Sequence, residues 1–155
     1  MSDVTLVFTA CGGFLLAVLW MDLIFDSQVL AHRHSREQLP EAVLASIAGY
    51  YHRATTSSRP MSTLIALVMA ILVAALSFRA AFGDDPGWLI AVAAALAGIP
   101  ILLAMTRTVP NAVRLGKRAD TLAVQTRLAR SIFADHVLGF VFIVGFLALW
   151  LADAA

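Results

Sequence analysis

Carboxylates and imidazoles are the side chains of this sequence best suited to chemistry, and four of them stand beside long apolar runs. Asp22 and Asp26 close one run and are four residues apart, so a helix places both on one face. His52 stands shortly before a second run, and His136 opens the last one. A carboxylate close to hydrocarbon is costly unless it has a partner inside the protein. These four residues therefore form the candidate site.

Four roles suit this group of side chains. Asp22, Asp26, His52 and His136 could bind iron, manganese or zinc through mixed carboxylate and imidazole ligands, although the Glu-x-x-His pairs of di-metal bundles are absent. A haem could lie between His52 and His136. Desolvated Asp and His could perform acid or base chemistry on a small apolar substrate. In the fourth interpretation, the acids only pair with His136 or with arginines and lock the helix ends together. The sequence leaves the cofactor unknown.

Two further histidines, His32 and His34, follow in the polar stretch AHRHSRE. On a helix, residues two apart diverge by about 200°. We therefore expect them to contact water or lipid headgroups rather than to share a metal.

The composition is that of a membrane protein. Of 155 residues, 61% are hydrophobic and only 14% are charged, which lies outside the range of soluble globular domains. The single cysteine, Cys11, excludes an internal disulfide or a thiolate metal cluster within one chain. A net charge of +1 gives no support for a nucleic-acid partner. We expect the lipid bilayer to surround the protein.

We predict one all-α domain, residues 1–155, built as a bundle of four transmembrane helices. The spans are expected at about residues 4–25, 61–82, 87–106 and 133–152, each long enough for roughly 30 Å of hydrocarbon. No basic segment precedes the first span and no small-residue cleavage site follows it, so we expect a resident helix rather than a signal peptide. Small residues at Gly12, Gly13, Ala17 and 91–98 predict close helix contacts, and Pro100 predicts a kink.

Basic residues in the connections predict the orientation, because Lys and Arg near span ends resist translocation. The first connection contains Arg33, Arg36, Arg53 and Arg59. The third contains Arg107, Arg114, Lys117, Arg118, Arg127 and Arg130. The second has Arg79 beside Asp84 and Asp85. We therefore expect both termini outside the cytoplasm of a bacterial inner membrane, with the candidate site at the cytoplasmic face.

The long connections carry helical patterns of their own. PEAVLASIAGYYHR, residues 40–53, predicts a short amphipathic helix at the interface, with Tyr50 and Tyr51 at headgroup level. Asp120 is the predicted N-cap of the last helix, which is expected to start well outside the membrane. Asp135 and His136 are about 100° apart on that helix and should point at different partners.

The second half of the chain resembles the anthrone-oxygenase-like family of small four-helix membrane proteins. The resemblance covers residues 59–151 and rests on RPMSTLIAL, TVPNAVRLGKRAD and FADHVLGFVFIVGFLALWL. The residues that match the motifs of that family are Pro110, Asn111, Arg114 and His136. The resemblance implies oxidation of an activated aromatic carbon by dioxygen, without a bound cofactor. It implies that His136 is the general base, that Asn111 hydrogen-bonds the developing enolate oxygen, and that Asp22 orients His136.

The rival prediction is an accessory subunit without catalytic activity, which binds other membrane subunits or a second copy of itself. Two features favour this prediction: the third span is rich in alanine, and three aromatic residues are expected to be exposed. These are Trp20, Trp88 and Trp150. A transporter or channel is disfavoured, because the outer half of the bundle offers few polar side chains. These are Thr5, Thr9, Thr63 and Ser77.

Overall fold

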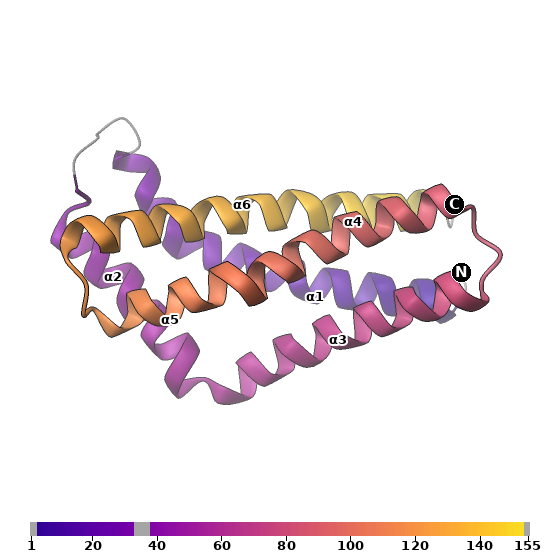
Figure 1. Cartoon of the computed structure of the whole chain (residues 1–155), viewed down its shortest axis with the longest axis horizontal. Helices are drawn as coiled ribbons and strands as arrows, with labels where there is room; N and C mark the ends of the chain where they lie inside the picture. Colours follow the sequence, from indigo (N-terminus) through magenta and orange to yellow (C-terminus); the bar gives the residue numbers. More distant parts are fainter. Residues whose placement is uncertain (1–2, 33–37, 154–155) are drawn as a thin grey trace.

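The computed structural model describes residues 3–32 and 38–153, and every regular element in these ranges is helical (Figure 1). The element order is α1 (Asp3–Asp26), the 3-10 helix η1 (Ser27–His32), α2 (Glu41–His52), the π turn η2 (Arg53–Ser57), α3 (Arg59–Phe82), α4 (Gly87–Leu103), the π turn η3 (Ala104–Thr108), α5 (Val109–Lys117) and α6 (Leu122–Asp153). The predicted all-α architecture is confirmed.

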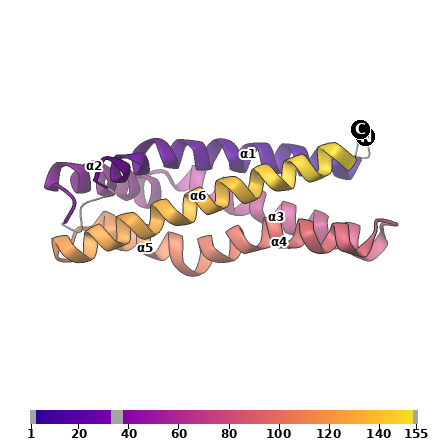
Figure 2. The ribbon, with the colours of Figure 1, turned by 90° about the horizontal axis from the view of Figure 1, so that it is seen from above.

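Four helical stretches are long and apolar enough to cross a membrane, as predicted. They are Val4–His32, Arg59–Phe82, Gly87–Lys117 and Leu122–Ala152. Figures 1 and 2 show them running side by side along the long axis of the molecule. The third stretch is longer than expected, because η3 joins α4 to α5 without a break one turn after Pro100. A π turn is a common way to accommodate such an irregularity.

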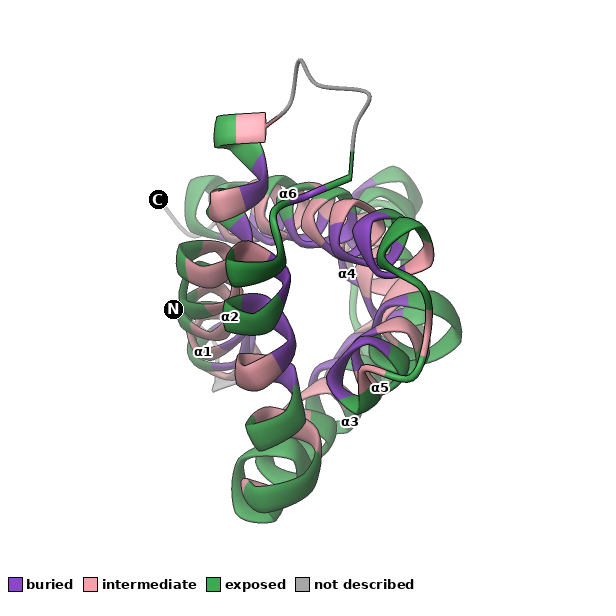
Figure 3. Cartoon of the chain, turned by 90° about the vertical axis from the view of Figure 1, so that its left-hand side faces the viewer, coloured by how far each residue is buried: buried purple, intermediate pink, exposed green. Residues whose placement is uncertain are grey.

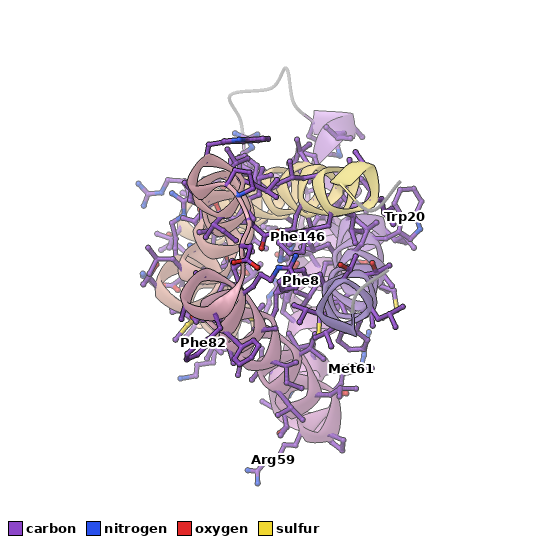
Figure 4. The ribbon with its side chains drawn as sticks, turned by 90° about the vertical axis from the view of Figure 1, so that its right-hand side faces the viewer. Phe8, Trp20, Arg59, Met61, Phe82 and Phe146 are labelled. Atoms are coloured by element: carbon purple, nitrogen blue, oxygen red, sulfur yellow. The ribbon has the colours of Figure 1, made fainter. Side chains whose placement is uncertain are left out.

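The half of the bundle that carries both chain termini (Figure 1), called the outer half below without regard to the membrane side, is filled by aromatic and aliphatic side chains. Phe8 of α1 and Phe146 of α6 point into the centre, in contrast to Phe82 at the periphery (Figure 4). The Phe8 and Trp150 rings lie 4.6 Å apart between centroids. Trp20 and Trp88 are exposed as expected, but Trp150 is buried, so the expectation of an exposed Trp150 is wrong. Its ring faces α1 and fills the core instead of contacting lipid.

Only part of the small-residue pattern lies between the helices of this chain. A Cβ at Gly12 would lie 2.8 Å from the Leu147 side chain, so Gly12 lets α1 and α6 approach closely. On α4, Ala93 and Ala97 are buried, but the other alanines of this helix face outward. The exposed small residues are Gly13, Ala17, Ala91, Ala94 and Ala95.

A second hydrophobic core lies beyond the outer one, at the end of the bundle where α2 and α5 pack on the start of α6 (Figure 3). The predicted amphipathic helix is confirmed as α2, and its apolar side presents Leu44, Ile47 and Tyr51 to this core. That Tyr50 and Tyr51 lie at headgroup level stays a prediction, but Tyr51 is buried and Tyr50 is partly buried. Both hydroxyls point toward α1, where they donate hydrogen bonds to the partly buried Asp22 and the buried Asp26.

The last helix begins at Leu122, well before its apolar part, as predicted. Asp120 is not its N-cap, because the first helical hydrogen bond runs from Gln125 N to the Thr121 carbonyl. The Asp120 carboxylate instead accepts two hydrogen bonds from Arg114 at 2.7 and 2.8 Å. This ion pair lowers the pKa of Asp120, and it ties the end of α5 to the connection before α6.

Candidate functional site

Three helices supply the polar side chains of the candidate site. The last turns of α1 carry Asp22 and Asp26 on one face, because residues four apart align on a helix. Tyr50 and Tyr51 come from the last turn of α2, and His136 comes from the middle of α6. The site therefore joins segments that are more than a hundred residues apart in the sequence, as the bond between Asp26 and His136 shows.

Asp26 is the centre of this cluster and has no exposed surface. Its Oδ1 atom accepts a hydrogen bond of 2.7 Å from the Tyr51 hydroxyl. Its Oδ2 atom lies 2.7 Å from Nδ1 of His136. A carboxylate only accepts hydrogen bonds, so Nδ1 carries the proton and donates a hydrogen bond to Asp26. In a neutral imidazole this leaves Nε2 as the nitrogen with a free lone pair.

Asp22 stands next to that second nitrogen. Its Oδ2 atom is 3.7 Å from Nε2 of His136, and its Oδ1 atom accepts a 2.6 Å hydrogen bond from Tyr50. The sequence allows His136, a metal or an arginine as the partner of Asp22. In the structure, His136 is the one of these at ion-pair distance. His136 is therefore flanked by a carboxylate on each side of its ring.

The two tyrosines act as hydrogen-bond donors to the two acids. Burial, followed by the neighbouring charges of Asp26 and Asp22, raises the pKa of Tyr51. Burial and the charge of Asp22 raise the pKa of Tyr50 in the same way. Both phenols therefore keep their protons at neutral pH. Tyr50 is held in place by Phe25, whose ring stacks on it at 4.1 Å between centroids.

Asp135 makes a separate cluster, as the angle between adjacent helical residues predicts. Its carboxylate pairs with Arg107 and accepts a 3.0 Å hydrogen bond from the Thr108 hydroxyl. Both partners belong to the π turn η3, which places two consecutive side chains on one carboxylate. The Asp135 side chain is buried, whereas half of the Arg107 side chain is exposed. This cluster holds the irregular part of the third helix against α6.

A partly open cavity of about 150 Å³ lies between the helices next to these groups. Most of its wall is aliphatic, including Leu15, Leu19 and Ile143. Polar groups come from Asp22, Thr108, Asp135 and His136 at one part of the wall. An apolar cavity of this size can enclose a single aromatic ring. The site thus combines an oriented imidazole with room for a small molecule.

The predicted metal and haem ligands are only partly brought together. Asp22, Asp26 and His136 meet, but His52 is exposed on α2, with its backbone against Gly116 of α5. Within residues 3–32 and 38–153, no three His, Cys, Asp or Glu side chains are arranged to hold a metal ion. Haem ligation by His52 and His136 has no geometric support either.

The remaining predicted residues lie outside the cluster. Asn111 on α5 has its side-chain nitrogen 3.5 Å from the Ser131 hydroxyl and is not among the residues that line the cavity. The proposed role of Asn111 as enolate donor therefore stays a prediction without a supporting contact. His32 ends η1, where its carbonyl lies 3.4 Å from an Arg130 nitrogen. His34 lies outside the described residues.

Sequence reasoning missed three members of the two clusters: Tyr50, Tyr51 and Arg107. The two tyrosines were interpreted as interfacial because they lie on an amphipathic helix. A signal was available, since a buried carboxylate needs a donor, and Tyr50 and Tyr51 are the only tyrosines in the chain. No comparable signal marks Arg107 as a partner of Asp135, because its position depends on the π turn.

The fold and the site define a class: a helical bundle with four membrane-length helices and a buried cluster of carboxylates, phenols and one imidazole beside an interior cavity. Comparisons with protein-family models, with curated proteins and with solved structures found no match to this chain.

Proposed function

We propose that this chain is a membrane-embedded enzyme in which Nε2 of His136 removes a proton from a small apolar substrate in the interior cavity. The observation that carries the proposal is the hydrogen bond of 2.7 Å from Nδ1 of His136 to the fully buried Asp26. It fixes the imidazole tautomer and directs the basic nitrogen away from Asp26. This is the arrangement by which a buried carboxylate prepares a histidine for general-base catalysis.

Asp22 has a role after the proton has moved. Nε2, which would accept the proton, lies 3.7 Å from Oδ2 of Asp22. The charge of the proton would then be balanced on the Nε2 side by Asp22 and on the Nδ1 side by Asp26. Because the wall of the cavity is mostly apolar, these charges are less screened than at the protein surface and act more strongly on the imidazolium.

The cavity limits the substrate to one carrying a single ring or a body of similar size. The resemblance to anthrone oxygenases suggests dioxygen as the partner of the carbanion. In that reaction a substrate CH₂ group becomes C=O; one oxygen atom of O₂ enters the product and the other leaves as water. The reaction balances without a further reductant. A fused three-ring substrate is larger than this cavity, so we favour a single-ring carbon acid.

The test measures proton abstraction directly. Purified protein in lipid nanodiscs would be incubated with phenylacetone in D₂O, and deuterium uptake at its acidic C–H positions would be followed by NMR. We expect His136→Gln to reduce the protein-dependent rate at least about 100-fold, the usual range for loss of a general base. Asp26→Asn should also reduce it strongly, because an amide can donate to Nδ1 and reverse the tautomer. Exposed His52→Gln is the matched control and should keep the rate.

Unchanged exchange in His136→Gln would overturn the proposal. Oxygen consumption is a separate readout: exchange accompanied by one O₂ consumed per C=O formed supports the oxygenase chemistry. Exchange without oxygen uptake would restrict the activity to proton transfer.

A second candidate, the accessory subunit, is favoured by the outward-facing small residues Ala91, Ala94 and Ala95 of α4. Small residues allow another helix to approach closely within a membrane. In this case the chain would co-purify in mild detergent with a stoichiometric partner or as a homo-oligomer. Ala94→Leu would disrupt that assembly and leave the exchange reaction unaffected.

A further inference from the structure

The inner half of α3 packs more loosely than the rest of the bundle. Its two buried residues, Leu72 and Leu76, both lie in the outer half, whereas Met61, Leu64 and Leu67 are exposed. Figure 1 shows this end of α3 diverging from α1, and Figure 4 shows Arg59 and Met61 far from the central Phe8 and Phe146. The bundle is therefore open on one side near the candidate site.

A groove of about 430 Å³ occupies this opening between α1, α2 and α3. Phe14, Met21 and Ile65 give it an apolar floor. Toward the π turn η2 it becomes polar, with Arg53, Ser58 and Ser62 in its wall. The groove thus has an amphipathic lining, with its polar part at the end of the membrane-length helices.

The groove and the interior cavity share three wall residues: Val18, Asp22 and Ile65. Asp22 therefore faces both spaces, and only the side chains of α1 and α3 separate them. A modest movement of Ile65 would connect the groove with the cavity beside His136. An apolar molecule could then reach the cavity from the side, through the lipid-facing surface.

Arg53 gives the groove its charge preference. None of the ion pairs formed between described residues includes Arg53, and its guanidinium lies beside Gly49, one turn earlier. At the other end, Asp22 would repel an anion. An acidic head therefore fits only at Arg53, with the apolar body directed toward Asp22 and the cavity. Because a cavity of about 150 Å³ holds one aromatic ring, a groove of about 430 Å³ has room for a single-ring or single-chain amphiphile.

We propose that this groove binds a single-ring carboxylic acid, with its carboxylate on Arg53 and its ring between α1 and α3, and that it is the lateral route to His136. The route rests on the proposed function, because it assumes that His136 acts on the bound molecule. Binding of the acid in the groove does not depend on the proposed function. The groove thereby adds an acidic head, bound at Arg53, to the single-ring apolar body on which His136 is proposed to act.

The experiment uses the full chain in nanodiscs of a neutral lipid, with empty nanodiscs as background. Binding of radiolabelled 5-phenylvalerate is measured by equilibrium dialysis and compared with the neutral analogue 5-phenylpentanol. We expect saturable binding of the acid that Arg53→Gln weakens about tenfold, the usual size of a charge-assisted contact of about 1.4 kcal/mol. Binding of the alcohol should change little.

Arg59→Gln is the matched control, because Arg59 is an exposed arginine near the groove that does not line it. It should leave the affinity for 5-phenylvalerate unchanged. Absence of saturable binding, or equal weakening by Arg59→Gln, would overturn the proposal and leave only general attraction to a basic surface. Failure of the catalytic proposal is distinguishable, since His136→Gln is tested by proton exchange and binding needs no turnover.

Discussion

Asp26 shows how one side chain can organise a site inside an apolar bundle. Both of its oxygens accept hydrogen bonds, from Tyr51 and from His136, and the residue has no exposed surface. A buried carboxylate without such donors would cost several kcal/mol. The partners that offset this cost also set the direction of the imidazole. Stability and proposed reactivity therefore depend on the same two hydrogen bonds.

At the residue scale, the two tyrosines should make the stability of the folded protein depend on pH. Burial and the neighbouring carboxylates raise the pKa of Tyr51 and of Tyr50 above the usual value of about 10. A raised pKa means that the folded state holds its protons more tightly. The stabilisation of the folded state by the two protonated phenols is therefore complete below about pH 10. It declines as the pH rises through their raised pKa values.

We expect no phenolate absorbance from the folded protein as pH rises past 10, and its appearance only together with unfolding. Spectrophotometric titration with parallel circular dichroism measures this, and the signal is unambiguous because the chain has two tyrosines. A free-tyrosine titration curve from folded protein would contradict the hydrogen bonds to Asp22 and Asp26.

In the Asp135 cluster, we expect removal of the arginine and removal of the carboxylate to lower the free energy of unfolding by different amounts. Arg107→Ala leaves a buried carboxylate with only the Thr108 hydroxyl as partner, which should cost about 3 kcal/mol. Asp135→Ala leaves an arginine whose side chain is half exposed and can be solvated, so it should cost about 1 kcal/mol. Unfolding in mixed detergent and denaturant measures both. The double variant should resemble Asp135→Ala, and equal effects of the two single variants would contradict this account.

At the scale of elements, the position of α2 determines where the tyrosines point. A Cβ at Gly116 of α5 would lie 2.9 Å from the backbone nitrogen of His52, so α2 and α5 touch through backbone at this point. Their contact buries Ala112 and Leu115 against Tyr51 and its neighbours. The glycine therefore allows the approach that brings Tyr50 and Tyr51 to α1.

Replacing this glycine should separate the two helices. We expect Gly116→Ala to destabilise the protein by about 1 to 3 kcal/mol and to weaken the tyrosine hydrogen bonds, because backbone cannot move aside as a side chain can. Gly98→Ala is the matched control: its Cβ would meet open space, and alanine favours a helix by up to about 1 kcal/mol. Denaturant unfolding compares them. Similar stabilities for the two variants would show that the α2 and α5 contact is less close than described.

At the scale of the whole molecule, the orientation in the membrane remains a prediction from charge. The basic connections lie at the end of the bundle that carries the candidate site, and the acidic turn at Asp84 and Asp85 lies at the other. We propose that the site end faces the cytoplasm, as the distribution of Lys and Arg predicts.

Cysteine labelling tests this orientation. In a Cys11→Ala background, Asp84→Cys should react with a membrane-impermeant maleimide on intact bacterial cells, and Ala45→Cys should react only after permeabilisation. Both positions are exposed, so access to reagent reports the side of the membrane. Labelling of position 45 but not of 84 on intact cells would reverse the topology.

Much of this fold follows from the sequence alone. Uninterrupted apolar runs longer than a bilayer is thick require helices, since only a helix satisfies its backbone groups within one segment. The same reasoning indicates that Asp22, Asp26 and His136 lie near one face, and the structure brings these three together. The early start of the last helix and the helix at residues 41–52 also follow from local patterns.

Only the tertiary structure determined which groups meet. Local patterns predicted that Tyr50 and Tyr51 lie at the lipid headgroups, that Asp120 caps a helix and that Trp150 is exposed. In each case the actual partner lies on another element: Asp26, Arg114 and Phe8 respectively. A sequence pattern reports which face of a helix is apolar or polar, but the rotation of one helix against another depends on packing across the whole bundle. For that reason the apolar pattern identified the acids at the end of the first helix, but it did not identify the phenols as the groups that donate hydrogen bonds to them.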